Sequence, residues 1–120
     1  MDRWEALYAF WASFGVPAYE SNSVPDLKEI AFPFISYDAV SAAWDSNALC
    51  NASVWTRSSS WAAADALADA IEARIFGGCN IPYDGGTIWI TPESPFAQSM
   101  GDPDDDRIKR KLLSVVYHFS

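Results

Sequence analysis

The residue types that most often carry out chemistry are few in this chain and lie far apart. The 120 residues include a single histidine, His118, and two cysteines, Cys50 and Cys79. Nucleophilic catalysis requires a nucleophile, an adjacent base and a third group that orients the base, and no serine here lies in a Gly-x-Ser-x-Gly turn. One histidine and two separated cysteines also fall short of the four ligands of a usual zinc site. We therefore predict no enzyme activity and no cofactor.

A short acidic run at residues 102–106 is the best candidate for binding a cation. Clustered carboxylates are the hard oxygen ligands that divalent ions prefer. The run reads Asp-Pro-Asp-Asp-Asp, and it lacks the Asp-x-Asp-x-Asp-Gly spacing with a distal glutamate that marks a calcium loop. The alternative is a solvated loop beside basic residues, and this is the interpretation we favour, so no metal site is predicted.

The acidic run is followed directly by a basic one, and opposite charges side by side suit contact between copies of the chain. In a head-to-tail assembly, the acidic patch of one copy can meet the basic patch of the next. Aromatic residues number 18, more than a small core accommodates, and such side chains are enriched at interfaces. The predicted interface residues are Asp104, Asp105, Asp106, Arg107, Lys109, Arg110, Lys111, Trp89 and Phe96.

Two segments have the spacing of amphipathic helices. The first spans residues 3–14 and ends before Gly15, and the second spans residues 61–76 and ends before Gly77. Apolar side chains recur at intervals of three and four residues, which predicts one buried stripe on each helix. The stripes consist of Trp4, Leu7, Tyr8 and Trp11 in the first helix, beside a second apolar pair of Phe10 and Phe14, and of Ala64, Leu67, Ala68, Ile71 and Ile75 in the second.

Alternating side chains and turn-forming residues predict two hairpins and a final strand. The strands are 34–44, 49–57, Cys79–Tyr83, 87–91 and 107–119, with hairpin turns at 45–47 and 84–86. Two stretches, 16–33 and 92–106, are predicted as long loops of the kind that is usually functional or ordered by a partner. The apolar residues of the final strand do not keep one parity, which predicts a bulge or burial on both faces.

These elements predict one small α+β domain over residues 1–120. Their order is α-β-β-α-β-β-β, with a mostly antiparallel sheet of two hairpins plus a C-terminal strand, packed by two helices. The length agrees with a single domain of about 100–150 residues, and a chain that is 50% hydrophobic is not disordered. No uncharged apolar run approaches the roughly 18 residues of a membrane-spanning helix, and no signal peptide is expected.

The charge balance bears on partners. Sixteen acidic and eight basic residues give a net charge of −8. Nucleic-acid binding by phosphate neutralisation depends on clustered lysines and arginines. A chain this acidic is therefore not expected to hold DNA or RNA.

The sequence also contains short motifs in a characteristic order. In the first half these are Leu7-Tyr8-Ala9-Phe10-Trp11, Gly15-Val16-Pro17-Ala18-Tyr19 and Asn22-Ser23-Val24-Pro25. The second half has Val54-Trp55-Thr56-Arg57-Ser58, Tyr83-Asp84-Gly85-Gly86-Thr87-Ile88-Trp89-Ile90, Ser94-Pro95-Phe96-Ala97-Gln98 and Asp102-Pro103-Asp104-Asp105. Over nearly the whole chain, this order resembles the tail-completion or tail-terminator (head–tail joining) family of siphophages and prophages of Gram-positive bacteria.

The resemblance implies an α+β fold and a structural role in the phage virion. Members of the family form a homohexameric ring that caps the tail tube, ends tube polymerisation and presents a surface for head joining. The implied partners are further copies of the chain, the tail-tube protein and the head–tail connector proteins. Assembly takes place in the host cytoplasm without a membrane. Acidic residues in the lumen of such a ring would repel DNA, so the genome would pass through without specific binding.

Two alternatives remain open at this point. The chain could be a head–tail connector or adaptor (head-completion) protein, which binds on the portal side rather than on the tube. It could also be a small enzyme or a host-directed binding module. The single histidine and the missing catalytic motifs argue against an enzyme.

Overall fold

The computed structural model describes residues 1–40 and 46–120. Two helices and six strands are present within these residues, together with a 3₁₀ turn at Ser21–Ser23. The elements are α1 (Arg3–Ala12), β1 (Ala18–Glu20), β2 (Phe34–Tyr37), β3 (Ser46–Arg57), α2 (Ala62–Ile75), β4 (Cys79–Tyr83), β5 (Gly86–Gly101) and β6 (Ile108–Phe119). The prediction of an α+β fold with two helices and a mostly antiparallel sheet is confirmed.

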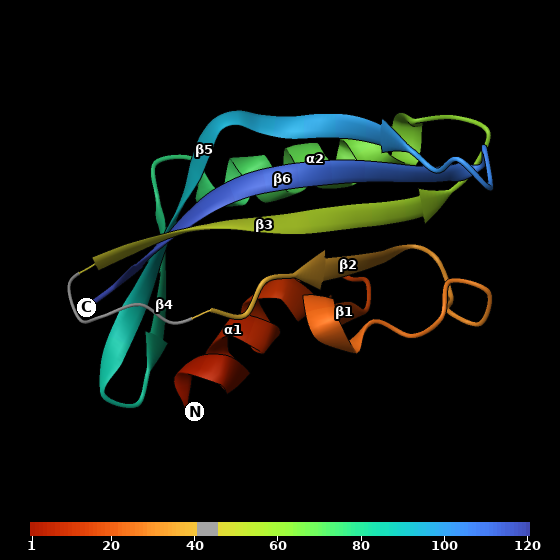
Figure 1. Ribbon diagram of the computed structural model, residues 1–120. Coiled ribbons are helices and arrows are strands. Elements are labelled where there is room, and N and C mark those ends of the chain that lie inside the picture. Colours follow the sequence, from red (N-terminus) through yellow and green to blue (C-terminus); the bar gives the residue numbers. More distant parts are fainter. Residues whose placement is uncertain (41–45) are drawn as a thin grey trace.

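The strands form one curled sheet in the order β1-β2-β3-β6-β5-β4 (Figure 1). Only the β1–β2 pair is parallel. β6 lies in the middle, and all 12 of its residues pair with the 12 residues of β3 without a break in register. On its other edge β6 pairs with β5. The last strand of the sequence is therefore the one that joins the two halves of the sheet.

Both helices pack on one face of this sheet and form the core with it. α2 contacts β3, β5 and β6, whereas α1 contacts β4, β1 and β2. The largest fully buried side chains come from both helices and from the strands between them: Trp11, Tyr117, Phe34, Phe119, Leu7, Ile35, Ile71 and Ile75. Neither of the two helices described is long and apolar enough to span a bilayer.

The opposite face of β3, β6 and β5 is the open face of the sheet, and no described helix covers it (Figure 1). On β6 the alternation is regular from Leu113 to Phe119, with every second residue buried under the helices. The residues between them, from Leu112 to His118, point to the open face. The structure thus has one face closed by helices and one face that is only partly covered, by the chain between β1 and β2.

The predicted stripe of the first helix is wrong in two of its four residues. Trp4 and Tyr8 are 44% and 51% exposed. The residues that α1 buries are Ala6, Leu7, Phe10 and Trp11. The helix has apolar side chains over more than half of its circumference, so periodicity alone does not choose between two overlapping stripes. For α2 the prediction is confirmed, with Ala64, Ala68, Ile71 and Ile75 buried and Leu67 partly buried.

The strand predictions were wrong mainly at the ends of elements. The strand predicted at 34–44 ends at Tyr37, and the predicted turn at 45–47 includes two residues, Ser46 and Asn47, that belong to β3; residues 41–45 lie outside the described part. The predicted loop at 16–33 contains β1, which gives the sheet a sixth strand that the predicted order lacks. Most of the predicted loop at 92–106 is strand, because β5 continues to Gly101.

The irregularity expected in the final strand lies instead in its partner. The pairing of β5 with β6 shifts between Pro92 and Ala97 of β5, whereas β6 itself is regular. Four residues of β5 lie opposite one residue of β6 here, so three extra residues are accommodated before the distal half of β5 rejoins the ladder. The mixed apolar parity of the final strand agrees with the other expectation, burial on both faces, because Leu112 and Val116 of the open face are partly buried.

A chain of buried hydrogen bonds connects α1, β6 and the segment after β2. The indole Nε1 of Trp11 donates to the hydroxyl of Tyr117 over 3.1 Å, and this hydroxyl donates to the carbonyl oxygen of Asp38, also over 3.1 Å. Burial raises the pKa of Tyr117, so the phenol remains protonated and can donate. One hydroxyl therefore satisfies two buried groups of the fold.

Replacement of Tyr117 by phenylalanine should destabilise the fold. It removes the hydroxyl and leaves the Trp11 N–H without an acceptor, which costs about 1–3 kcal/mol of unfolding free energy. Urea denaturation measures the change. The matched control is Tyr8→Phe, because Tyr8 is 51% exposed, and it should change stability by less than about 0.5 kcal/mol. Equal effects of the two substitutions would contradict the role assigned to the buried hydroxyl.

Candidate functional site

The acidic run forms the turn between β5 and β6 and is organised by its own backbone. Asp102 Oδ1 accepts hydrogen bonds from the backbone N–H groups of Asp104 and Asp105, over 2.8 and 3.1 Å. Aspartate favours such turns because its short side chain can replace a backbone acceptor. The Asp102 side chain therefore has a structural role, because it fixes the backbone at the tip of the hairpin.

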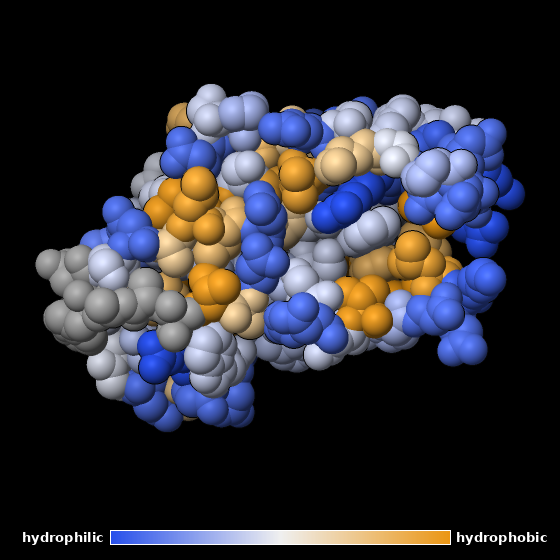
Figure 2. All heavy atoms as spheres, viewed as in Figure 1, coloured by the Kyte–Doolittle hydropathy of each residue, from blue (hydrophilic) through white to orange (hydrophobic). Residues whose placement is uncertain are grey.

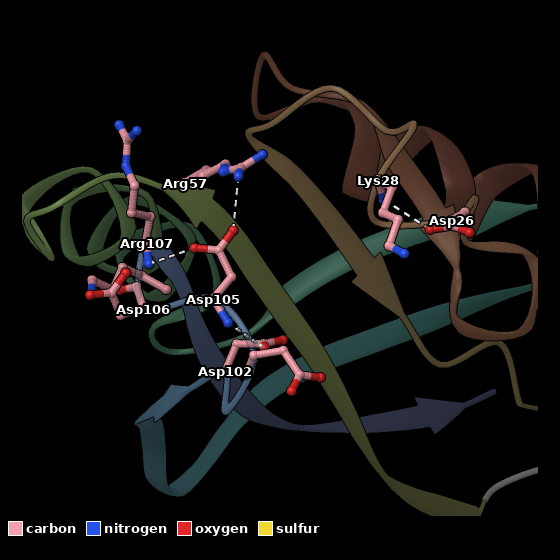
Figure 3. A network of polar contacts seen from close by, with 9 residues as sticks. Asp26, Lys28, Arg57, Asp102, Asp105, Asp106 and Arg107 are labelled. Carbon is pink, nitrogen blue, oxygen red and sulfur yellow. Dashed lines mark hydrogen bonds and ion pairs between the residues drawn. The ribbon is translucent and has the colours of Figure 1, made fainter.

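Asp105 ties this tip to β3. Its carboxylate forms an ion pair with Arg57, with 2.9 Å between Oδ2 and Nη2, and its Oδ1 accepts the N–H of Arg107 over 2.9 Å (Figure 3). Figure 3 also shows that the side chain of Arg107 points away from this network. Of the predicted interface residues at the tip, Asp104, Asp106 and Arg107 are thus the exposed ones, whereas Asp105 is engaged within the chain.

The carboxylates of the tip are not arranged as a metal site. In the part of the chain that the structure describes, no three His, Cys, Asp or Glu residues are placed to hold a metal ion. Asp102 and Asp105 use their oxygens for backbone N–H groups and for Arg57. The weak cation hypothesis for residues 102–106 therefore gains no support from the geometry.

Strand alternation divides the predicted basic patch between the two faces of the sheet. Lys111 points toward α2, where its Nζ forms an ion pair with Asp65 over 2.8 Å and donates to Ser99 Oγ over 2.8 Å. Lys109 points the same way, with its Nζ 5.5 Å from the centre of the Trp61 ring. Arg110 points to the open face. The three cations do not form one surface, contrary to the prediction.

Arg110 lies in a hollow on the open face. Its Nε donates to Ser53 Oγ over 3.0 Å, and its guanidinium carbon is 4.7 Å from the centre of the Trp55 ring. Trp55 is fixed in turn, because its Nε1 donates to Ser36 Oγ over 2.9 Å and its ring stacks on Phe34 with 5.6 Å between centroids. Arg110 thus rests on a rigid aromatic floor.

The hollow has a volume of about 260 Å³. Val24 and Leu27 line it from the segment between β1 and β2, and Asp38 lines it at the end of β2. Burial lowers the pKa of Arg110, and the charge of Asp38 opposes this shift. The residues of the hollow other than Arg110 were not part of the predicted site. The position of Ser53 beside Arg110 depends on strand pairing between residues 57 positions apart in the chain.

The remaining predicted interface residues, Trp89 and Phe96, have different environments. Trp89 is 41% exposed, and it lies opposite His118 on the open face. Its indole packs over Gly78, where an added Cβ would come within 2.0 Å of the ring. Phe96 is partly buried against the core, in the irregular part of β5. Of these two residues, Trp89 is therefore the one with an exposed ring surface that a partner could contact.

Several apolar side chains of the open face are exposed. Leu49 of β3 is 72% exposed and pairs with Val116 of β6, which is partly exposed. In Figure 2, which has the same viewpoint as Figure 1, hydrophobic side chains lie in separate areas of this surface with hydrophilic ones between them. Apolar side chains that are scattered in this way are common on protein surfaces and do not by themselves mark a contact site.

Among the described residues, the histidine and the two cysteines lie on opposite faces of the sheet. His118 points to the open face, where its Nδ1 contacts the amide oxygen of Asn47, whereas Cys50 and Cys79 lie on the face that the helices cover. Burial raises the pKa of the Cys50 thiol to about 12, with Asp38 adding to the effect, so the thiol is protonated near neutral pH. No family model, curated protein or solved structure matches the chain.

Substitutions at the hairpin tip should show which carboxylates stabilise the turn and which are only exposed to solvent. Asp102→Ala removes the acceptor of two backbone N–H groups and should lower the unfolding free energy by about 1–2 kcal/mol. Asp104→Ala, two positions away, should change it by less than about 0.5 kcal/mol. Chemical denaturation, with hydrogen exchange at the Asp104 and Asp105 amides, tests both. Unchanged exchange in Asp102→Ala would show that the turn does not need this side chain.

The two cysteines should react at different rates with iodoacetamide at pH 8. The Cys50 thiol is buried and protonated, because its pKa of about 12 lies far above this pH, whereas Cys79 is partly exposed. Mass spectrometry of peptides should find Cys79 modified first, with Cys50 modified at a comparable rate only in urea. Rapid modification of Cys50 in the folded protein would contradict its buried position.

Proposed function

We propose that the protein is a virion structural protein of the phage tail–neck region, which assembles as a ring on the tail tube, ends tube polymerisation and provides the head-joining surface. The proposal starts from the sequence resemblance. The structural observation that supports it best is the open face of the sheet. A protein whose role is assembly needs such a surface, whereas an enzyme needs a reactive site.

The half of the open face away from Arg57 and Arg110 is suited to a partner because it lacks formal charge. From Asn47 to Ser53 on β3, and from Leu112 to His118 on β6, the side chains on this face include no Asp, Glu, Lys or Arg. They are Asn47, Leu49, Asn51, Ser53, Leu112, Ser114, Val116 and His118. Depletion of charge is the compositional mark of the centre of an interface. In a chain with a net charge of −8, such a surface lets copies meet without like-charge repulsion.

The exposed tip of the β5–β6 hairpin supplies a second contact region. Asp104, Asp106 and Arg107 are exposed there, at one end of a molecule that extends 43 Å along its longest axis. A turn that exposes both charge signs at the end of the molecule can reach a neighbouring subunit. In this proposal the uncharged part of the open face is buried against the neighbouring subunit, and the charged tip fixes how the two subunits are oriented.

The direct test is disruption of the gene in its parent phage, with electron microscopy of the lysate. Tails of uncontrolled, excessive length are expected for a terminator, because only the stop signal is missing. Tails of normal length lying apart from filled heads would instead assign the head–tail adaptor role. A normal yield of complete virions would reject both, and would favour the enzyme or the host-directed module.

A surface substitution tests the face itself. Leu49→Asp should leave the monomer folded, because Leu49 is 72% exposed, but it should prevent ring formation by placing a charge at the contact. Negative-stain microscopy and light scattering, with the tail-tube protein present, measure assembly. The matched control is Phe76→Asp, since Phe76 is 78% exposed beyond the end of α2. If only Phe76→Asp loses its rings, the subunit interface lies on the helical side of the molecule and not on the open face.

A further inference from the structure

The hollow around Arg110 contains donors that the chain does not use. Nε of Arg110 is bonded to Ser53, but the two terminal nitrogens of its guanidinium have no hydrogen-bond partner among the described residues. By contrast, Arg57 and Lys111 form ion pairs, and Arg74 donates to Ser13 Oγ. Arg110 is partly buried, and its terminal nitrogens are not among the buried side-chain atoms that lack a partner, so they are open to an acceptor that enters the hollow.

The nearby carboxylate of Asp38 is already satisfied. Its Oδ1 accepts from Ser21 Oγ over 2.9 Å, and its Oδ2 accepts from the N–H of Asn51 over 2.9 Å. Asp38 therefore holds β2 and β3 together at the rim of the hollow. The hydrogen-bonding groups that remain unused in the hollow are therefore the donors of Arg110, which can bind an acceptor.

The walls of the hollow are largely apolar. Val24 and Leu27 form one side and the Trp55 ring forms the floor. The volume of about 260 Å³ is below the roughly 300–1,000 Å³ of sites for drug-sized ligands. It suits one amino-acid side chain or a small organic acid, with an apolar part against Leu27 and Trp55 and an acceptor at Arg110.

We propose that this hollow binds a carboxylate carried on a small apolar body, through paired hydrogen bonds to the two terminal nitrogens of Arg110. Arginine matches a carboxylate in this way because its planar fork presents two parallel N–H groups. Stacking on Trp55 and the bond to Ser53 fix the fork before a ligand arrives, which reduces the entropy cost of binding. The carboxylate belongs either to a free acid or to an acidic side chain of a partner protein. The site does not depend on ring formation.

Nuclear magnetic resonance of the full chain tests the proposal. The probes are phenylacetate, its neutral isostere phenylacetamide, and the blocked dipeptide acetyl-Leu-Glu-amide. The expected result is a saturable shift of the Arg110 Nε–H and Trp55 Nε1–H signals with phenylacetate, the dipeptide or both, and none with the amide. Binding of phenylacetate alone assigns a free acid, and binding of the dipeptide assigns a protein side chain. No saturable shift with either acid, or equal shifts with phenylacetamide, would overturn the proposal.

Variants locate the binding. Arg110→Gln should abolish it, whereas the control Arg107→Gln should preserve it, because the Arg107 side chain points away from its neighbours (Figure 3). If Arg110→Gln does not fold, Arg110→Lys keeps the charge and removes the fork, and it should bind about 10-fold to 100-fold more weakly. Undiminished affinity in either Arg110 variant would show that the carboxylate is held elsewhere.

Discussion

The pairing of β6 on both of its edges is the constraint on which the rest of the structure depends. Twelve residues of β6 pair with β3, and the same strand carries β5 and, through it, β4. Because neighbouring side chains on a strand point to opposite faces, this register also decides where the basic run goes. Lys109 and Lys111 are used to hold α2, and Arg110 is left on the open face. The continuous basic run at residues 109–111 is thus divided between the helical face and the open face of the sheet.

Features that depend on neighbouring residues could be predicted from the sequence. The buried stripe of α2 and the turn at Asp84-Gly85 follow from spacing and from glycine at positive φ. The strand predicted at 87–91 is also present, and in it Trp89 is exposed between the buried Ile88 and Ile90. The misassigned stripe of α1 has a physical cause: its apolar residues cover two overlapping faces, and only the position of the sheet selects Phe10 and Trp11.

Features that depend on distant pairing could not be predicted. β1 is three residues long and exists because β2 offers it an edge. The distal half of β5 was expected as a loop because Pro92 and Pro95 disfavour a strand, but β6 provides a template for it beyond the irregular region. The Arg110 hollow combines residues from β2, β3 and β6, with a wall from the segment after β1. No local pattern indicates that they meet.

The order of the strands has a consequence for how the chain acquires its fold. β6 is the last strand in the sequence and the central strand in the sheet, so the edge of β3 that receives it remains unpaired until β6 has been synthesised. α2, by contrast, and the β4–β5 hairpin need only local contacts. Long-range strand pairing of this kind makes folding slow, and the exposed edge of β3 is open to pairing with other chains in the meantime. The sheet can therefore close only when β6 is available to pair with both β3 and β5.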